Sequence, residues 1–405
     1  MNFERKRVNM KKVAIVTCYF NPNYGSVLQA YATQKILDEW NITCENICID
    51  GLKKDINRSK TRFYLKQLNN PQIITGTILR IGKKVLYKKL MKNTLGKNLA
   101  IRYRNFQSFG KENFKLSKVY HSKAELTAGC SEYSDVLVGS DQLWLPSNID
   151  ADYYTLTWVP DNVNKIAYAT SFGTNFLPKY QHEKTKQFLS RIDHVAVREQ
   201  VGQKMIKEYA GLDVPVVCDP TLLFTVDDWM CIQKKEPIIK EKYIFCYFLG
   251  NNTEDRAFAK RLRATTSYKL VALLHLDEYI KADDNYADIT PYDVGPGEML
   301  NLIRNAEYIV TDSYHGSVFS ILHRKTFFTS RRIKKEGILC TNNRLDSLFT
   351  MIGIEGRLIK GDEDVNECMS RTIDYDAVHV KLDVVREESR KYLIEALNIS
   401  EERLL

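Results

Sequence analysis

Short runs of β-branched and other apolar residues alternate with segments of helical periodicity along most of this 405-residue chain. A first set of expected strands spans residues 13–17, 47–49, 135–138, 166–170, 195–197 and 214–217. A second set spans residues 243–249, 270–275, 308–311 and 326–328. Strands that are apolar on both faces and linked by helices form parallel sheets with helices on each side. The alternation therefore predicts an α/β fold.

The two sets of strands predict two doubly wound, Rossmann-like domains that face a cleft. The length agrees with this, because one domain takes about 150 residues. We assign residues 1–230 to an N-terminal domain and residues 231–405 to a C-terminal domain. A last helix, at about residues 377–397, has apolar residues at helical spacing and is a candidate to pack back on the first domain.

One basic segment interrupts the alternation. Residues 51–104 carry 15 Lys and Arg residues and one acidic residue, Asp55, so this insert has a net charge of +14. The rest of the chain has 44 basic and 49 acidic residues, or −5, which together give the overall +9. Apolar residues lie between the basic ones, which predicts an amphipathic helical insert that docks on an anionic inner-membrane surface. A solvated helical hairpin is the alternative, and nucleic acid is not expected as a partner because no nucleic-acid-binding motif accompanies the charge.

The cysteine pattern and the apolar runs bear on location. The nine cysteines are scattered and form no CxxC pair, which fits a reducing cytoplasm and gives no zinc site. No apolar run approaches the ~20 residues needed to cross a bilayer. The basic start resembles a signal peptide, but its apolar run, residues 13–16, is too short, and Met10 is an alternative start. We therefore expect a cytoplasmic protein, peripheral on the inner face of the plasma membrane if the insert binds lipid.

The residues that follow each expected strand are candidates for a site, because ligands bind beyond the carboxyl ends of strands in open α/β sheets. Asn23, Tyr24 and Gly25 follow the first strand in a turn that opens a helix, where glycine allows close approach to the backbone. On this motif alone an ordinary βα loop is the simpler interpretation. No GxGxxG dinucleotide fingerprint is present.

The polar run 139–144 follows the third strand. Ser140, Asp141 and Gln142 can hydrogen-bond sugar hydroxyls, and Asp141 can also act as a base toward one of them. Trp144 can stack on a sugar ring. The competing interpretation is that these polar residues only cap the next helix.

Basic residues follow two further strands. Arg198 suits a phosphate or a carboxylate, although the pattern alone favours a surface arginine paired with Glu199. A second basic group, which is placed to neutralise an anion although most charge runs are solvated loops, comprises Arg331, Arg332, Lys334, Lys335 and, at the next helix start, Arg344.

The sharpest pattern is the run 308–320, a buried strand that leads directly into a polar turn and a helix. His315 falls in the first helical turn, and histidine is the side chain best matched to proton transfer near neutral pH. Ser313 lies in the turn, and Gly316 and Ser317 leave the backbone open to an anion. A histidine that merely hydrogen-bonds the turn is the alternative.

These stretches together resemble the polysaccharide pyruvyl transferase family. The resemblance spans roughly residues 12–350 and rests on NYGSVLQAYATQK (23–35), VLVGSDQLW (136–144), ATSFG (169–173), VRE (197–199), DPTLLF (219–224) and TDSYHGSVFSI (311–321). The family is similar in architecture to GT-B glycosyltransferases. Its characterised members transfer pyruvyl from phosphoenolpyruvate to a sugar and form a ketal.

The resemblance implies roles for the candidate residues. His315 occupies the position of the family's general acid. Asp141 is the candidate base from the polar run itself. The expected donor-binding residues are Arg198, Ser313, Gly316, Ser317, Arg331, Arg332, Lys334, Lys335 and Arg344. The expected acceptor-binding residues are Asn23, Tyr24, Gly25, Ser140, Gln142 and Trp144. Some members have arginine where this chain has Ser313, so one donor contact differs here.

The resemblance also implies the partners. Phosphoenolpyruvate is the expected co-substrate, with no further cofactor and no metal, and the acceptor is a sugar of a surface glycan or of its lipid-linked precursor, as in exopolysaccharide or capsule synthesis. The alternative is a GT-B-type nucleotide-sugar glycosyltransferase, in which Glu298 would hold the ribose, although Glu298 also fits a helix start. A non-catalytic glycan- or membrane-binding scaffold is the third hypothesis.

The membrane hypothesis gives a first prediction. Charge reversal of the lysines in residues 83–92 is expected to release the protein from anionic liposomes in a sedimentation assay, because the attraction is electrostatic. Unchanged binding, or no binding by the wild type, would reject membrane docking by this insert.

Overall fold

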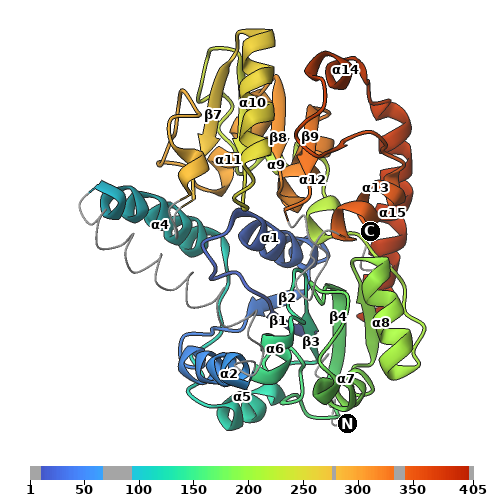
Figure 1. Ribbon diagram of the computed structural model, residues 1–405. Coiled ribbons are helices and arrows are strands. Elements are labelled where there is room, and N and C mark those ends of the chain that lie inside the picture. The colour runs from blue at the N-terminus through green and yellow to red at the C-terminus, as the bar shows by residue number, and fades with distance from the viewer. Residues whose placement is uncertain (1–10, 67–93, 276–279, 333–342, 401–405) are drawn as a thin grey trace, which may run out of the picture.

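The computed structural model describes residues 11–66, 94–275, 280–332 and 343–400, and its first half is built on a five-stranded parallel sheet (Figure 1). In the order β2-β1-β3-β4-β5, its strands are β2 (Thr43–Asn46), β1 (Lys12–Val16), β3 (Asp135–Val138), β4 (Asn164–Thr170) and β5 (His194–Val197). Two expectations were wrong. The second strand lies at Thr43–Asn46, before the predicted apolar run, and Val216 makes only an isolated bridge to Val197. Pro215 explains the second difference, since proline has no N–H for a ladder.

Side chains alternate across this sheet, so each face has its own core. On one face, Val13 and Ile15 pack with α1 (Tyr24–Glu39). On the other face, Ala14 and Val16 belong to a cluster that includes residues of several helices. Apart from the helices of the basic segment, the other helices and turns described in this half are α5 (Lys123–Gly129), η2 (Cys130–Glu132), α6 (Pro146–Ala151), η3 (Lys179–Gln181), α7 (His182–Leu189), α8 (Gln200–Ala210), η4 (Pro220–Leu222) and α9 (Val226–Met230).

The second half repeats the architecture. In the order β10-β9-β8-β6-β7, the strands of its parallel sheet are β10 (Leu358–Ile359), β9 (Thr326–Ser330), β8 (Tyr308–Thr311), β6 (Tyr243–Tyr247) and β7 (Lys269–Leu273). Its helices are α10 (Thr253–Thr266), η5 (Lys281–Asp283), α11 (Pro296–Asn305), α12 (Tyr314–Leu322), α13 (Asn343–Ile352), α14 (Val365–Ser370) and α15 (Tyr375–Ala396). The predicted α/β fold with two doubly wound sheets is confirmed.

Both sheets have the same strand order, and this order fixes where a ligand can bind. In each sheet the first strand lies between the second and the third, so the chain leaves β1 and β3, or β6 and β8, toward opposite faces. The carboxyl ends of such strand pairs form the crevice that holds ligands in doubly wound folds. The polar runs after β1, β3 and β8 therefore start at these two crevices.

Helix α1 lies between the two sheets and joins their cores (Figure 1). One continuous apolar cluster runs from Val13 through α1 to Phe319 of α12 and Ile309 of β8. At the start of α1 the hydroxyl of Tyr24 donates a hydrogen bond to the Val294 carbonyl in the second half, at 2.7 Å. The two halves are therefore packed against each other through buried apolar and polar contacts.

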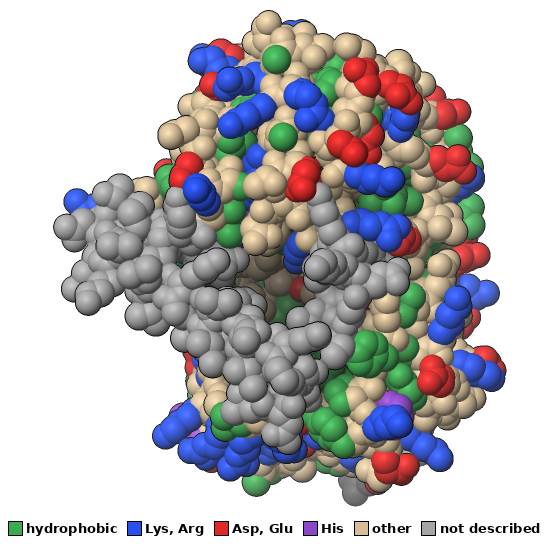
Figure 2. Space-filling view, in the orientation of Figure 1, with side chains coloured by type: hydrophobic (Ala, Val, Ile, Leu, Met, Phe, Trp, Pro, Cys, Tyr) green, Lys and Arg blue, Asp and Glu red, His purple; other side chains and the backbone are tan. Residues whose placement is uncertain are grey.

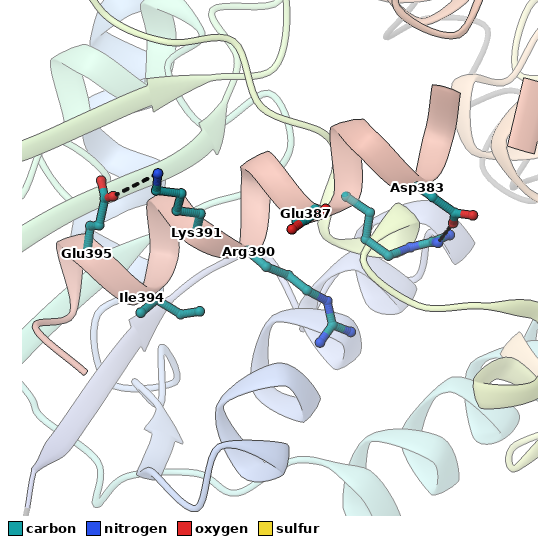
Figure 3. Close-up of a pocket in the computed structure, with 7 residues that line it drawn as sticks. Asp383, Glu387, Arg390, Lys391, Ile394 and Glu395 are labelled. Atoms are coloured by element: carbon teal, nitrogen blue, oxygen red, sulfur yellow. Dashed lines mark hydrogen bonds and ion pairs between the residues drawn. The ribbon is translucent and has the colours of Figure 1, made fainter. Parts of the chain in front are cut away.

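Helix α15 runs from the second half down along the first (Figure 1). Arg386 and Arg390 donate hydrogen bonds to the carbonyls of Leu222 and Leu223, at 2.9 and 2.8 Å. Figure 3 shows the charged face of this helix, where Arg390 points toward α1 and Lys391 pairs with Glu395. A shallow groove of about 630 Å³ along this face shares no lining residue with the cavity between the two sheets.

The ends of the basic segment are described as two helices, α2 (Lys53–Lys66) and α4 (Thr94–Asn113). Residues 67–93, including the lysines of 83–92, lie outside the described residues. Helix α4 continues past residue 104, where the insert was predicted to end. Arg102 is buried and donates hydrogen bonds to the carbonyls of Leu274 and Pro291 in the second half, at 3.0 and 2.9 Å. This arginine therefore braces the two halves and is no part of a solvated basic face. No helix among the described residues is long and apolar enough to cross a membrane.

Helix α15 gives a prediction for stability. Leu382 is fully buried in the shared core, so Leu382→Ala is expected to lower the free energy of unfolding by about 2–5 kcal/mol. Val380 on the same helix is 66% exposed, and Val380→Ala is expected to change the free energy of unfolding by less than ~0.5 kcal/mol. Urea titration measures both values. Equal effects of the two substitutions would contradict the packing of α15 described above.

Candidate functional site

A cavity of about 700 Å³ lies where the carboxyl ends of the two sheets face each other. Figure 2 shows the molecule hollowed between its upper and lower parts. From the first half the cavity is lined by residues after β1, including Asn23 and Ser26, and after β3, including Asp141 and Gln142. From the second half it is lined by residues after β6, β7 and β8, and by Arg332 after β9. The loops at both topological switch points thus form part of its walls.

His315 projects from the first turn of α12 and contacts the first half of the chain on two sides. A Cβ atom at Gly25, in the first turn of α1, would lie 2.0 Å from the imidazole Nδ1, so only glycine leaves room for the ring. On the other side, Nε2 lies 3.6 Å from the carboxylate Oδ2 of Asp219. The imidazole also lines the cavity. One half therefore provides the histidine, and the other half provides the groups that position it.

Asp219 is fully buried and holds four groups together. Its Oδ2 accepts hydrogen bonds from Arg198 at 2.7 Å and from Ser140 at 3.0 Å, and faces His315. Its Oδ1 accepts from the hydroxyl and backbone N–H of Thr221. Burial alone would raise the pKa of Asp219, but His315 and Arg198 outweigh burial and lower it well below its usual value. The surroundings of Asp219 therefore favour its ionised form beside the imidazole.

Arg198 lies beneath the cavity. Its side chain is 1% exposed, it contacts Asp219 and, at 3.7 Å, Asp141, and its guanidinium lies 4.6 Å from the ring centre of Tyr314. Burial would lower its pKa, but Asp219, Tyr314, Asp141 and Glu199 raise it. Arg198 does not line the cavity, so in this arrangement it reaches no ligand directly, in contrast to the predicted donor contact. It holds the two carboxylates in place.

Asp141 is an acidic group at the cavity surface. Its Oδ2 accepts a hydrogen bond from the Ser26 hydroxyl at 2.7 Å and faces the Cys18 thiol at 3.6 Å. Burial would raise the pKa of Asp141, but the charges of Arg198, His315 and Arg344 outweigh burial and lower it. Asp141 is thus an ionised acceptor that shares the cavity with His315.

The cations that line the cavity are Lys60, Arg102, Arg332 and Arg344. The Nε atom of Arg332 is buried without a hydrogen-bond partner among the described residues. Burial, together with Arg198 and Arg332, lowers the pKa of Arg344 to about 10. Among the described lining residues these cations surround one carboxylate, that of Asp141, and such a concentration of positive charge suits an anionic ligand.

The sequence profile of the polysaccharide pyruvyl transferase family matches residues 23–329. The chain belongs to the polysaccharide pyruvyl transferase family. The matched range contains Gly25, Asp141, Arg198, Asp219 and His315. A comparison with curated proteins finds no match.

Two solved structures with a similar fold contain bound UDP. The UDP-GlcNAc 2-epimerase of Methanocaldococcus jannaschii, in complex with UDP-GlcNAc and UDP, is 12% identical, with a TM-score of 0.51 over 96% of this chain and 100% of the epimerase chain. S. aureus MnaA in a co-structure with UDP is 11% identical, with a TM-score of 0.51 over 96% of this chain and 98% of its own. These similarities show the fold alone. They agree with the predicted GT-B-like arrangement of two Rossmann-like domains.

The family motif around residue 140 holds two residues that do not face the cavity as predicted. Trp144 is 0% exposed, because its ring packs on Phe172 and Phe188 and its indole N–H donates to the Tyr154 carbonyl. The prediction that Trp144 stacks on a sugar was therefore wrong. Ser140 is also fully buried and bonds to Asp219, so it positions that carboxylate and does not reach an acceptor.

The motif around His315 is packed more tightly than its sequence suggests. The Ser313 hydroxyl accepts a hydrogen bond from the Gly316 N–H at 3.2 Å, so the helix caps itself there. The Ser317 hydroxyl is buried and bonds to Ser313 and Thr329. Gly316 and Ser317 therefore do not leave an open backbone for an anion, as was predicted. Ser313 does line the cavity.

The remaining predicted residues fall into three groups. Asn23, Tyr24, Gln142, Arg332 and Arg344 line the cavity, and Nε2 of Gln142 is buried without a hydrogen-bond partner among the described residues. Arg331 is half exposed, pairs with Asp346 at 2.8 Å and does not line the cavity, in contrast to its predicted donor contact. Lys334 and Lys335 lie outside the described residues.

Sequence reasoning missed several residues of this site. Asp219 belongs to a stretch that carried the family resemblance, and its place just beyond the expected strand 214–217 was the available signal. His275 follows β7 and lines the cavity, with Nδ1 3.0 Å from Asp283. Lys60 and Tyr64 were counted only as part of the basic insert, yet both line the cavity. No group of three or more His, Cys, Asp or Glu side chains in the described ranges is arranged to hold a metal ion.

The contact between Gly25 and His315 gives a prediction. Gly25→Ala is expected to lower the free energy of unfolding by about 1–3 kcal/mol, because the added methyl group overlaps the imidazole. Gly110→Ala in α4 is the matched control, since its methyl group would meet Phe114 at an ordinary 3.7 Å. That substitution is expected to be neutral or to stabilise by up to ~1 kcal/mol, because alanine favours helix. Wild-type stability of Gly25→Ala in urea titration would contradict the close packing of His315.

Proposed function

We propose that this chain transfers pyruvyl from phosphoenolpyruvate to a sugar and forms a pyruvate ketal, with His315 as the general acid. The observation that carries the proposal is the position of His315, which lines a cation-rich cavity while its imidazole lies between Gly25 and the ionised Asp219. Membership of the polysaccharide pyruvyl transferase family supports the reaction class.

The first chemical step is protonation of the methylene carbon of phosphoenolpyruvate. Asp219 faces the imidazole of His315 at 3.6 Å, and a positioned histidine is an effective proton donor near neutral pH. Protonation turns the methylene group into a methyl group and leaves the neighbouring carbon electron-poor. We therefore assign the proton donor to His315 and the positioning of its ring to Asp219.

The donor carries a phosphate and a carboxylate, so its site needs positive charge. Arg332 and Arg344 line the cavity from the same half of the chain as His315. The guanidinium of Arg344 lies 5.8 Å from the ring centre of Tyr314, next to the histidine in sequence, which places this charge near the reacting end. Arginine is well suited to both anionic groups because its fork of N–H donors matches their oxygens. We assign these two arginines to the donor.

The acceptor must lose two hydroxyl protons as the ketal forms. A first hydroxyl attacks the electron-poor carbon, and we assign Asp141, which lines the cavity, to accept its proton. Phosphate then leaves, and a second hydroxyl closes the ketal at the same carbon. Overall, the two hydroxyls release two protons. One restores to His315 the proton that it gave to the methyl group, and the other leaves with phosphate. The acceptor is a sugar of a surface glycan or of its lipid-linked precursor.

A nucleotide-sugar glycosyltransferase has weaker support from the site. Glu298, the residue expected to hold a ribose, accepts a hydrogen bond from the Gly295 N–H at 3.1 Å and does not line the cavity. Its carboxylate caps α11. The described part of this wall therefore supports the pyruvyl-transfer proposal over the alternative.

The proposed role of His315 is tested by His315→Ala. We expect this variant to lose phosphate release from phosphoenolpyruvate by about 10²–10⁴-fold, which is the usual contribution of general acid catalysis. Ketal formation, followed by mass spectrometry of candidate glycans, is expected to fall equally. Binding of phosphoenolpyruvate, followed by thermal shift, is expected to remain because the arginines are unchanged.

The control for this test is His121→Ala, since His121 is exposed and lies outside the cavity. It is expected to keep wild-type turnover. Turnover of His315→Ala near the wild-type rate would refute the assigned acid. Stabilisation of the wild type by a nucleotide sugar but not by phosphoenolpyruvate would refute the donor.

A further inference from the structure

Both described helices of the basic segment contribute a cation and an aromatic ring to the cavity. Lys60 and Tyr64 come from α2, and Arg102 and Tyr103 come from α4. Tyr64 is 51% exposed and Tyr103 is 41% exposed, although large aromatic side chains are usually buried. Their exposure at a cavity wall indicates a surface that is covered when a ligand binds.

Lys60 and Tyr64 form one face of α2, because residues four positions apart lie above one another on a helix. Ile56 and Phe63 of the same helix are buried in the protein, which fixes how α2 is turned. The orientation that buries these two residues directs Lys60 and Tyr64 to the cavity. From the sequence, Lys60 was assigned to the basic insert that was expected to bind a membrane. In the structure it lines the cavity.

The charge of Lys60 is not neutralised within the described part of the protein, where no carboxylate lies within ion-pair distance (4.0 Å) of its ammonium group. The side chain is partly buried, and burial lowers the pKa of Lys60 because a desolvated ammonium group is less stable. An anion bound in the cavity would offset that cost. A lysine in this environment is therefore suited to an anionic ligand.

Helix α4 is held rigidly at the cavity. Arg102 donates hydrogen bonds to the carbonyls of Leu274 and Pro291, and Asn105 donates to Asp293 at 2.8 Å. Phe106 packs on Tyr24, with ring centres 4.8 Å apart. Tyr103, which lies between these fixed residues, thus has a backbone that is locked in place.

We infer that α2 and α4 form the acceptor subsite, in which Tyr64 and Tyr103 pack on a pyranose ring and Lys60 binds an acidic substituent of that sugar, a phosphate or a carboxylate. This inference rests on the proposed function, because it takes the cavity as the place where a sugar meets the donor. It also assigns to these tyrosines the ring contact that the buried Trp144 does not make. Amphipathic aromatic rings suit a sugar, which presents an apolar ring face and polar edges. Asp141 and Gln142 line the same cavity and can bind its hydroxyls.

Binding of defined sugars to the full-length protein tests this subsite. The probes are galactose 1-phosphate, galacturonic acid, neutral galactose and inorganic phosphate, with affinities measured by calorimetry or saturation-transfer NMR. We expect the wild type to bind both acidic sugars more tightly than galactose. Tyr64→Ala and Tyr103→Ala are each expected to weaken the binding of all three sugars about tenfold. Tyr64→Phe keeps the aromatic ring, so this variant is expected to bind the sugars with wild-type affinity. Lys60→Met is expected to weaken the binding of the acidic probes alone, also by about tenfold.

Matched controls come from residues of the same types outside the cavity. Lys54 is exposed on α2 and Tyr180 is 49% exposed, and neither lines the cavity, so Lys54→Met and Tyr180→Ala are expected to bind like the wild type. The affinities for galactose 1-phosphate and galacturonic acid, compared with each other, show whether the subsite prefers a phosphate or a carboxylate substituent.

Two outcomes would overturn the subsite: a wild type that binds none of the sugars, or tyrosine and lysine variants that bind them like the wild type. Affinity for phosphoenolpyruvate, measured in the same proteins, is expected to be unchanged by the tyrosine substitutions. If the wild type binds phosphoenolpyruvate but the sugar predictions fail, only the subsite is wrong. If the sugars bind as predicted but phosphoenolpyruvate does not, the proposed donor is wrong.

Discussion

The site depends on the insertion of one imidazole between two halves of the chain. His315 comes from the second half, and its ring is confined by Gly25 and faces Asp219 in the first half. Neither half alone contains both His315 and Asp219. The geometry of the proton donor is therefore set by how the two sheets pack, and the contacts that fix this packing also fix the site. These contacts include the apolar cluster around α1, the hydrogen bond from Arg102 to the second half and the hydrogen bonds from α15 to the first half.

Charge is organised in layers around this pair. Buried carboxylates and Arg198 form an inner layer in which each charge has a partner, with Asp219 held by Arg198 at 2.7 Å. Cations from both halves, Arg332, Arg344 and Lys60, line the cavity above it. The inner layer positions the acid, and the outer layer suits an anionic ligand. An arginine in the inner layer and one in the outer layer are therefore not equivalent, although the sequence presents them alike.

The sequence predicted the fold and the position of His315 because both follow from local patterns. Apolar strands linked by helices define the two sheets, and a polar turn after a buried strand falls at the ligand-binding edge. The partners of His315 could not be predicted in this way, since Asp219 and Gly25 lie far from it in sequence and meet it only in the packed structure. The prediction for Trp144 failed because a residue's place after a strand does not tell which way its side chain faces. Arg102 was counted as surface charge because the carbonyls that bind it belong to residues of the second half.

The proposed function depends on protonation of the methylene carbon of phosphoenolpyruvate in the cavity. It is tested most directly by the mass of the product formed in D₂O from phosphoenolpyruvate and an accepted glycan. We expect a ketal whose methyl group carries one deuterium that is not lost on return to H₂O. A product that keeps the unprotonated enolpyruvyl double bond, or a glycan that is modified only by a nucleotide sugar, would contradict it.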